Sequence, residues 1–278
     1  MALNPDVVGS VTDPVIATWS STDALLYAVG VGAGVNDLAV TTENTSGIEQ
    51  VVLPTFAVTI GWGRVPTLTG IGEFDPALLV HSGQGVVLHR PIPVAGTATL
   101  VGRVDSMWDK GSAAVVETST TASVDDEPLF TTTASVFIRG AGGWGGERGP
   151  APTDLVAPDG VPHGSATMRT TPDQALIYRL SGDRNPLHSD PAFAARGGFD
   201  RPILHGLCSY GFTSRALLWH LCDGDPAGFK SMTGRFVSPV VPGDELTVRW
   251  WRVDRHRAVF TTLVGERVVI DRGGFEWD

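Results

Sequence analysis

Cysteine is scarce in this sequence of 278 residues, which contains only Cys208 and Cys222. Two cysteines exclude a disulfide framework and a metal site built from several thiolates, so a reducing cytoplasm is the simplest setting. No apolar run approaches the roughly 20 residues that a membrane-spanning helix needs. Residues 1–10 lack the features of a signal peptide, and the last residues lack a peroxisomal address of the Ser-Lys-Leu type. We therefore expect a cytoplasmic protein with no membrane partner.

Basic residues are also few, because 20 lysines and arginines face 30 aspartates and glutamates, which gives a formal net charge of -10. A chain with this balance repels polyanions, so nucleic acid is not an expected partner. Hydrophobic residues make up 42% and charged residues 18% of the chain, a composition that predicts a sizeable core and excludes extensive disorder. The length allows one large domain or two of roughly 100–150 residues.

Glycine and proline are spread along the chain and are densest from Gly140 to Pro152, near its midpoint. This cluster predicts two modules, 1–145 and 161–278, joined by a linker over 146–160. Helices are expected at 24–31, 175–180 and 206–221, and the run from Ser20 to Asp23 offers capping side chains for the start of the first. Strands are expected at 51–53, 55–60, 85–88, 97–104, 113–118 and 129–138 in the first half, and at 231–236, 245–253, 258–264 and 267–270 in the second.

The two halves have the same order of elements, and Tyr27 parallels Tyr178 at an offset of 151 residues. Two proline-containing turns also match, Pro91 to Gly96 with Pro239 to Gly243, each ahead of a long strand. We interpret the chain as a duplicated unit of one helix and an antiparallel sheet.

The segment with the most chemistry follows the helix expected at 175–180. Gly182 and Pro186 break that helix, so Asp183, Asn185 and His188 fall on irregular backbone. Such a loop can bring an acid and an imidazole to one point, as acid–base catalysis requires. Gly206 then opens the next helix, where a backbone N–H is free to bind a negatively charged group.

The run from Ser181 to His188, Ser-Gly-Asp-Arg-Asn-Pro-Leu-His, and Pro-Ile-Leu-His-Gly at 202–206 resemble the signature of the MaoC-like (R)-specific 2-enoyl-CoA hydratases, the hydratase 2 family. Four further segments resemble its two-module members: Tyr27 to Gly34, Leu53 to Ala57, Asp105 to Gly111 and Arg139 to Gly146. The resemblance covers nearly the whole chain. It implies an α+β double hot-dog fold, in which two long antiparallel sheets each wrap a central helix and the modules pack sheet to sheet.

The resemblance also implies the reaction, which is reversible addition of water to a trans-2-enoyl-CoA to give a (3R)-3-hydroxyacyl-CoA. Asp183 and His188 match the catalytic pair, Asn185 matches the residue that orients the loop, and the N–H of Gly206 matches the donor to the thioester carbonyl. Ser214 matches a polar site residue of some relatives. We expect His188 as the base and Asp183 as the acid, with the reverse assignment left open. The substrate is an acyl-CoA thioester; no cofactor or metal is expected, and the protein is expected to be a homodimer.

One departure from the family lies at His81-Ser82-Gly83-Gln84, where two-module members have His-Gly-Glu-Gln. Gly83 therefore replaces a glutamate that is often near the substrate tunnel. We take His81, Gly83 and Gln84 as candidate residues of an acyl pocket formed by the first module. Loss of the acid indicates an altered pocket or a different acyl group, such as a bulky steroid side chain.

A catalytic pair is missing from the first module, because offset 151 places Gly32 at the acid position and Asp37 at the histidine position. We therefore expect one active site per chain, in the second module. Two other functions stay open, a dehydratase acting on a carrier-protein thioester and a non-catalytic acyl-thioester-binding subunit. A metal site formed by His188, Asp190 and His205 and a dinucleotide site at Gly30 to Gly34 fit the spacings poorly. Arg215 is interpreted as a solvated helix residue, with contact to the CoA phosphates as the alternative.

Overall fold

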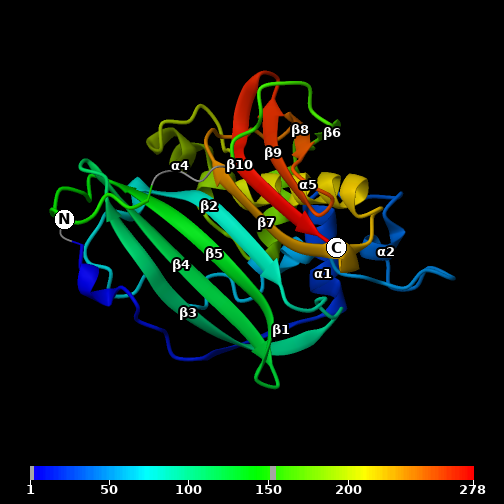
Figure 1. Cartoon of the computed structure of the whole chain (residues 1–278), viewed down its shortest axis with the longest axis horizontal. Helices are drawn as coiled ribbons and strands as arrows, with labels where there is room; N and C mark the ends of the chain where they lie inside the picture. Colours follow the sequence, from blue (N-terminus) through cyan, green and yellow to red (C-terminus); the bar gives the residue numbers. More distant parts are fainter. Residues whose placement is uncertain (1–2, 151–154) are drawn as a thin grey trace.

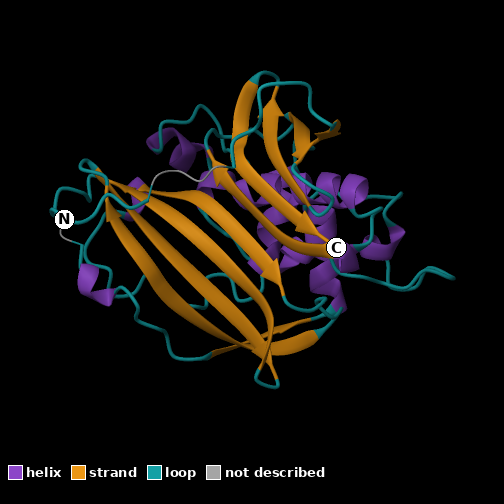
Figure 2. Cartoon of the chain, in the orientation of Figure 1, coloured by secondary structure: helices purple, strands orange, loops and turns teal. Residues whose placement is uncertain are grey.

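Ten antiparallel strands form one continuous sheet in the computed structural model, which describes residues 3–150 and 155–278 (Figures 1 and 2). The strand order is β1-β3-β4-β5-β2-β7-β10-β9-β8-β6. The first half contributes β1 (Val15–Trp19), β2 (Leu79–Leu88), β3 (Gly96–Asp109), β4 (Ala113–Val124) and β5 (Glu127–Arg139). The second half contributes β6 (Gly164–Arg169), β7 (Phe229–Phe236), β8 (Glu245–Arg252), β9 (Arg257–Val264) and β10 (Arg267–Trp277).

The helices are short except for α5. The α-helices are α1 (Ser21–Gly30), α2 (Leu38–Thr41), α3 (Gln174–Tyr178), α4 (Pro191–Arg196) and α5 (Gly206–Leu221). Single 3-10 turns are η1 (Pro5–Val7), η2 (Pro54–Val58), η3 (Pro76–Leu78), η4 (Arg179–Ser181), η5 (Pro186–His188) and η6 (Pro226–Gly228).

The two modules meet edge to edge in the middle of the sheet, where β2 pairs with β7 (Figure 1). The register places Gly83 opposite Arg235 and Gly85 opposite Thr233. The expectation that the modules pack sheet to sheet is therefore wrong. The two edge strands hydrogen-bond to one another because this satisfies the backbone groups that an unpaired edge would expose.

Helix α5 packs against the sheet of the second module, and α1 shares the same hydrophobic core (Figure 2). Most of α5 is buried, which explains why its sequence is apolar over nearly its whole length. Helix α1 begins with a capping box, in which Ser20 Oγ accepts from the Asp23 N–H and the Asp23 carboxylate accepts from the Ser20 N–H. The helices expected at 24–31 and 206–221 are confirmed, and α1 begins three residues earlier than expected, at Ser21.

The strand predictions at 51–53 and 55–60 are wrong. Pro54 begins the 3-10 turn η2 instead, because its fixed φ suits the first residue of a helical turn and its missing N–H weakens a strand. The expected strands at 85–88 and 267–270 are the ends of longer strands, β2 and β10. β1 and β6 were not expected; β6 follows the predicted linker over 146–160, which includes residues 151–154, outside the described part of the chain.

The two tyrosines at offset 151 pack against each other, with ring centroids 6.2 Å apart in an edge-to-face arrangement. Tyr27 lies on α1 and Tyr178 ends α3, and both are fully buried. Equivalent residues of the two halves therefore meet at the contact between the modules, as the duplicated-unit interpretation requires.

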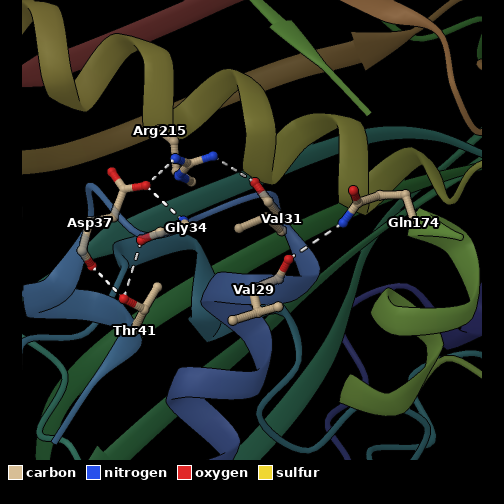
Figure 3. Close-up of polar contacts among 7 residues, drawn as sticks. All are labelled: Val29, Val31, Gly34, Asp37, Thr41, Gln174 and Arg215. Carbon is tan, nitrogen blue, oxygen red and sulfur yellow. Dashed lines mark hydrogen bonds and ion pairs between the residues drawn. The ribbon is translucent and has the colours of Figure 1, made fainter. Parts of the chain in front are cut away.

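The second module caps the carboxyl end of α1 (Figure 3). The N–H groups of Gly32 and Ala33 already bond to Val29 and Ala28, which leaves the carbonyls of Gly30 and Val31 without intrahelical partners. Side chains of the second module supply both partners. Gln174 Nε2 donates to the Gly30 carbonyl at 2.7 Å, and Arg215 Nη1 donates to the Val31 carbonyl at 3.0 Å.

Arg215 also pairs with Asp37 of the first module, with 2.9 Å between Nη2 and Oδ2 (Figure 3). The side chains of Arg215 and Asp37 are only 15% and 19% exposed, so the expectation of a solvated Arg215 is wrong. The Asp37 carboxylate also accepts from the N–H of Gly34. This arrangement, which we call the α1 clamp (Gln174, Arg215, Asp37 and the carboxyl end of α1), ties the modules together.

Candidate active site

The loop between η4 and η5 holds Asp183 and Asn185 in two consecutive turns. Gly182 precedes them with φ of +129°, a conformation that favours glycine. The Asp183 carboxylate accepts from the Asn185 N–H at 3.1 Å, and the Asn185 side-chain oxygen accepts from the Leu187 N–H at 3.0 Å. Asn185 is exposed and caps η5, so in this structure its side chain orders the loop.

His188 lies at the end of η5 and is buried. Its Nδ1 is 2.9 Å from the carbonyl of Ile203, and because a carbonyl only accepts, Nδ1 carries the proton in the neutral ring. Nε2 is then the unprotonated nitrogen. Burial lowers the pKa of His188, although the Ile203 carbonyl and Asp183 oppose this shift. At neutral pH the ring is thus uncharged and Nε2 can accept a proton.

His205 lies directly behind His188, with ring centroids 3.7 Å apart and the rings stacked. Its Nε2–H donates to the backbone carbonyl of Asp183 at 3.2 Å, so His205 holds both members of the predicted pair. Burial, followed by the charge that His188 can carry, lowers the pKa of His205 to about 3. His205 therefore stays neutral throughout the physiological range and acts as a support for the loop.

Ligand-type atoms of Asp183, His188 and His205 all lie within 4.8 Å of one another. These residues could in principle hold a divalent cation, but binding one would occupy the only unprotonated nitrogen of His188. Asp190, considered above as a ligand, accepts from the N–H groups of Ala192 and Phe193 and caps α4. It does not join this cluster.

Gly206 is the first residue of α5, and no hydrogen bond among the described residues uses its N–H. This N–H follows His205 directly, so it starts the helix beside the Asp183 loop. Ser214 is eight residues further along α5, which is about 12 Å along the helix axis. It is buried, and among the described residues its side chain forms no hydrogen bond with Asp183 or His188. Its predicted role in the site therefore finds no support in the geometry.

His81, Gly83 and Gln84 lie on β2, at the boundary between the modules. Burial lowers the pKa of His81, and the Gly83 carbonyl and then the Asp183 carboxylate oppose this shift, so the Asp183 charge acts on His81 across this boundary. Gln84 is buried and donates to the carbonyl of Gly85 at 2.9 Å. A side chain at position 83 would make only ordinary contacts, 3.5 Å from Ser135, so sterics do not require the glycine.

The first module has no equivalent of the catalytic loop. Gly32, at the acid position, has φ of +79°, and a Cβ there would lie 2.3 Å from the ring of Phe212. An aspartate at this position would have to adopt an unfavourable φ and displace the Phe212 ring. Asp37, at the histidine position, is held in the α1 clamp by Arg215. Both positions have a structural role in place of a catalytic one.

Acidification should weaken the fold through the buried histidines. The folded-state pKa of His205 and of His188 lies below the usual 6.5. Above pH 6.5 both states are neutral, whereas below it the unfolded chain binds protons that the folded chain does not. Each histidine then costs up to about 1.4 kcal/mol of unfolding free energy per pH unit as the pH falls. Urea unfolding at pH 8, 6 and 5 should show His205→Gln losing less stability than the wild type, and equal losses would contradict the neutral assignment.

Phe236 is a residue of this region that sequence reasoning missed. Its ring lies against Gly206 and 5.1 Å from the ring of His81. Phe236 ends a predicted strand and lies 30 residues from Gly206 in the sequence, so no motif or spacing links the two. The packing of α5 against β7 brings Phe236 to Gly206, and the pairing of β7 with β2 brings it to His81.

Comparison with known proteins agrees with this geometry. Residues 155–272 match the MaoC like domain family, and residues 18–140 match the MFE-2 hydratase 2 N-terminal domain family. Among the described residues, no helix is long and apolar enough to cross a membrane.

Two curated proteins of Mycobacterium tuberculosis are similar to the chain over nearly its full length. It is 46% identical over 288 residues to 3-hydroxyacyl-thioester dehydratase Y, covering 100% of this chain and 99% of that protein. It is 41% identical over 278 residues to enoyl-CoA hydratase ChsH3, covering 96% of this chain and 95% of that protein.

The crystal structure of a MaoC-like dehydratase from Phytophthora capsici superposes with a TM-score of 0.91 at 34% identity, covering 99% of this chain and 98% of that one. The expected α+β double hot-dog fold is confirmed. The chain therefore belongs to the MaoC-like hydratase 2 family, with a first module of the MFE-2 hydratase 2 N-terminal type and a second module of the MaoC type.

Proposed function

We propose that this protein is an (R)-specific 2-enoyl-CoA hydratase, which reversibly adds water to a trans-2-enoyl-CoA to give a (3R)-3-hydroxyacyl-CoA. The observation that carries the proposal is the pairing of a neutral His188 with Asp183 in one cluster, beside the free N–H of Gly206. A base, an acid and an oxyanion donor are what this addition requires.

In the hydration direction, His188 Nε2 takes a proton from water as the water oxygen attacks carbon 3 of the enoyl thioester. The Nδ1–H bond to the Ile203 carbonyl fixes the tautomer that leaves Nε2 free, which favours His188 over Asp183 as the base. The stacked, neutral ring of His205 holds His188 in this orientation without adding a competing charge.

Electrons of the carbon 2–carbon 3 double bond move toward the thioester carbonyl as the new C–O bond forms. The N–H of Gly206 stabilises the charge that develops on that oxygen, and one such donor is worth roughly 3–4 kcal/mol. His188 passes the proton taken from water to the Asp183 carboxylate, and Asp183 then donates this proton to carbon 2. One water is consumed, and both side chains return to their starting states.

A second candidate is a 3-hydroxyacyl-thioester dehydratase that acts on a carrier protein. The name of the 46% identical relative specifies a thioester but not its carrier. The net charge of -10 argues against docking of an acidic carrier protein. A non-catalytic acyl-thioester-binding subunit is disfavoured because it would not need a loop that orders an acid and a histidine together.

An assay with purified protein separates these functions. Loss of the enoyl-thioester absorbance should be seen with short, long and steroid-derived enoyl-CoA substrates, at different rates for each. The same acyl groups on an acyl carrier protein should react at least about 10-fold more slowly, because two acidic proteins repel. A clear preference for the carrier-bound substrates would favour the dehydratase, and no turnover of either kind would favour a binding subunit.

One CoA ester should bind per chain. The second module holds the proposed catalytic residues, and Gly32 and Asp37 of the first module have structural roles. We propose that the first module contributes His81, Gly83 and Gln84 to the wall of an acyl pocket. Isothermal titration calorimetry with a non-reactive CoA thioester should give a stoichiometry close to one, and a value of two would contradict the single-site assignment.

We also propose that the protein is a cytoplasmic homodimer and that it needs no cofactor or metal. We further propose that it consists of modules 1–145 and 161–278, joined by a linker over 146–160. The free thiols Cys208 and Cys222 support a reducing compartment. Light scattering of the purified protein would establish its oligomeric state.

A further inference from the structure

His81 of the first module reaches the proposed oxyanion site through the ring of Phe236, which belongs to the second module. A bulge in β2 at Ser82 breaks the pairing with β5, since His81 is opposite Val136 while Gly83 is opposite Ser135. A bulge re-aims the neighbouring side chains, and bulges are frequent next to active sites. His81 Nε2–H donates to the Gly83 carbonyl across this bulge at 2.9 Å, which fixes the orientation of the His81 ring.

The fixed ring of His81 lies edge to face with the ring of Phe236, at the end of β7, and their centroids are 5.1 Å apart. The Phe236 ring in turn packs on the start of α5, where a Cβ built on Gly206 would lie 3.3 Å from it. One turn further along α5, the ring of Tyr210 also lies edge to face with the ring of Phe236, with centroids 6.4 Å apart. Phe236 thus contacts positions 206 and 210, which lie on the same face of the helix.

We propose that His81 and Phe236 are positioning residues, which act together to hold the Gly206 N–H in place for the thioester carbonyl. This inference rests on the proposed function and assigns to the first module a part in the chemical step, beyond lining the acyl pocket. His81 acts through Phe236, because Phe236 and not His81 contacts Gly206.

The chemistry explains why such support is needed. The first N–H groups of a helix are not fixed by intrahelical hydrogen bonds, and glycine gives the backbone at 206 extra freedom. An oxyanion donor must be preorganised to be effective, and a displacement of about 1 Å can cost roughly 100-fold in rate. The Phe236 ring fills the space beside Gly206 that a side chain would otherwise occupy, and it limits movement of the amide.

A double-mutant cycle tests the proposal in the full-length protein. Phe236→Ala should lower kcat by about 10- to 100-fold and His81→Ala by about 10-fold. The double variant should be no slower than Phe236→Ala, since His81 acts through Phe236. KM should change by less than about 3-fold for enoyl-CoA substrates of every chain length. Phe236→Leu, which keeps most of the volume, takes the place of Phe236→Ala if that variant does not fold.

The vibrational frequency of the carbonyl group can be measured for a bound, isotope-labelled, non-reactive CoA thioester. This frequency would not change if His81 and Phe236 had a purely structural role. The wild-type protein should shift this frequency down through the Gly206 hydrogen bond, and the shift should shrink in His81→Ala and Phe236→Ala. His89→Ala is the matched control, because His89 follows β2, is exposed, and its side chain hydrogen-bonds to Thr131 at the surface. It should leave kcat and the carbonyl frequency unchanged.

Three results would overturn the proposal. These are additive losses of kcat in the double variant, a rise in KM that depends on chain length without a loss of kcat, and an unchanged carbonyl frequency in both single variants. Failure of the proposed function is a separate outcome, since the wild-type protein itself would then show no hydration.

Discussion

Replacing His188 by alanine, or Asp183 by asparagine, is expected to lower kcat for enoyl-CoA hydration by at least about 100-fold with little change in thermal stability. His188→Ala removes the proposed base, whose Nδ1–H bond to the Ile203 carbonyl leaves Nε2 free to take a proton from water. Asp183→Asn keeps the shape of the side chain and the acceptor for the Asn185 N–H, but it removes the proton that carbon 2 must receive.

Steady-state kinetics and circular dichroism on both variants check this expectation. Asp190→Ala is the matched control from the same segment, because Asp190 only caps the short helix α4. It should keep kcat within about 3-fold of the wild type. If a folded Asp183→Asn or His188→Ala variant kept more than about a tenth of the wild-type kcat, that residue would not be catalytic.

The second large effect is expected at the α1 clamp, where Arg215→Ala should reduce the free energy of unfolding by about 2–4 kcal/mol. The substitution leaves the buried Asp37 carboxylate without its counter-charge and the Val31 carbonyl without a donor. Arg215→Lys should recover only part of the loss, because one ammonium group cannot bond to both acceptors in the geometry of a guanidinium.

Urea unfolding measures the clamp, and Arg257→Ala is the matched control. Arg257 also pairs with an aspartate at 2.8 Å, but both side chains are well exposed, so its loss should change stability little. Equal effects of Arg215→Ala and Arg257→Ala would show that the clamp does not stabilise the contact between the modules. A change in the urea m-value would show that the modules had begun to unfold separately.

The sequence predicted the elements that carry strong local signals. The capping residues at Ser20 and Asp23 and the apolar run after Gly206 gave the correct helix starts, because capping and burial act on neighbouring residues. The segment at 55–60 was wrongly predicted as a strand because Thr, Phe and Val favour strands. The preceding Pro54 instead begins a 3-10 turn. β1 and β6 were not predicted, and they are only five and six residues long.

The proposed site was predictable where it lies on one loop, since Asp183, Asn185 and His188 fall within six residues. The tertiary contacts of the site could not be predicted from the sequence. The stacking of His205 on His188 depends on the path from η5 to α5, and the contact of Phe236 with Gly206 depends on β7. The burial of Arg215 follows from the position of Asp37 in the other module, 178 residues away.

The configuration of the hydration product tests the central claim most directly. Wild-type protein, incubated with a trans-2-enoyl-CoA and no other enzyme, should yield the 3-hydroxyacyl-CoA with the (3R) configuration, and His188→Ala should yield almost none in the same time. Chiral chromatography of the hydrolysed acyl group resolves the two enantiomers. A (3S) or racemic product, or an equal yield from His188→Ala, would contradict the assignment of this chain as an (R)-specific hydratase that acts through Asp183 and His188.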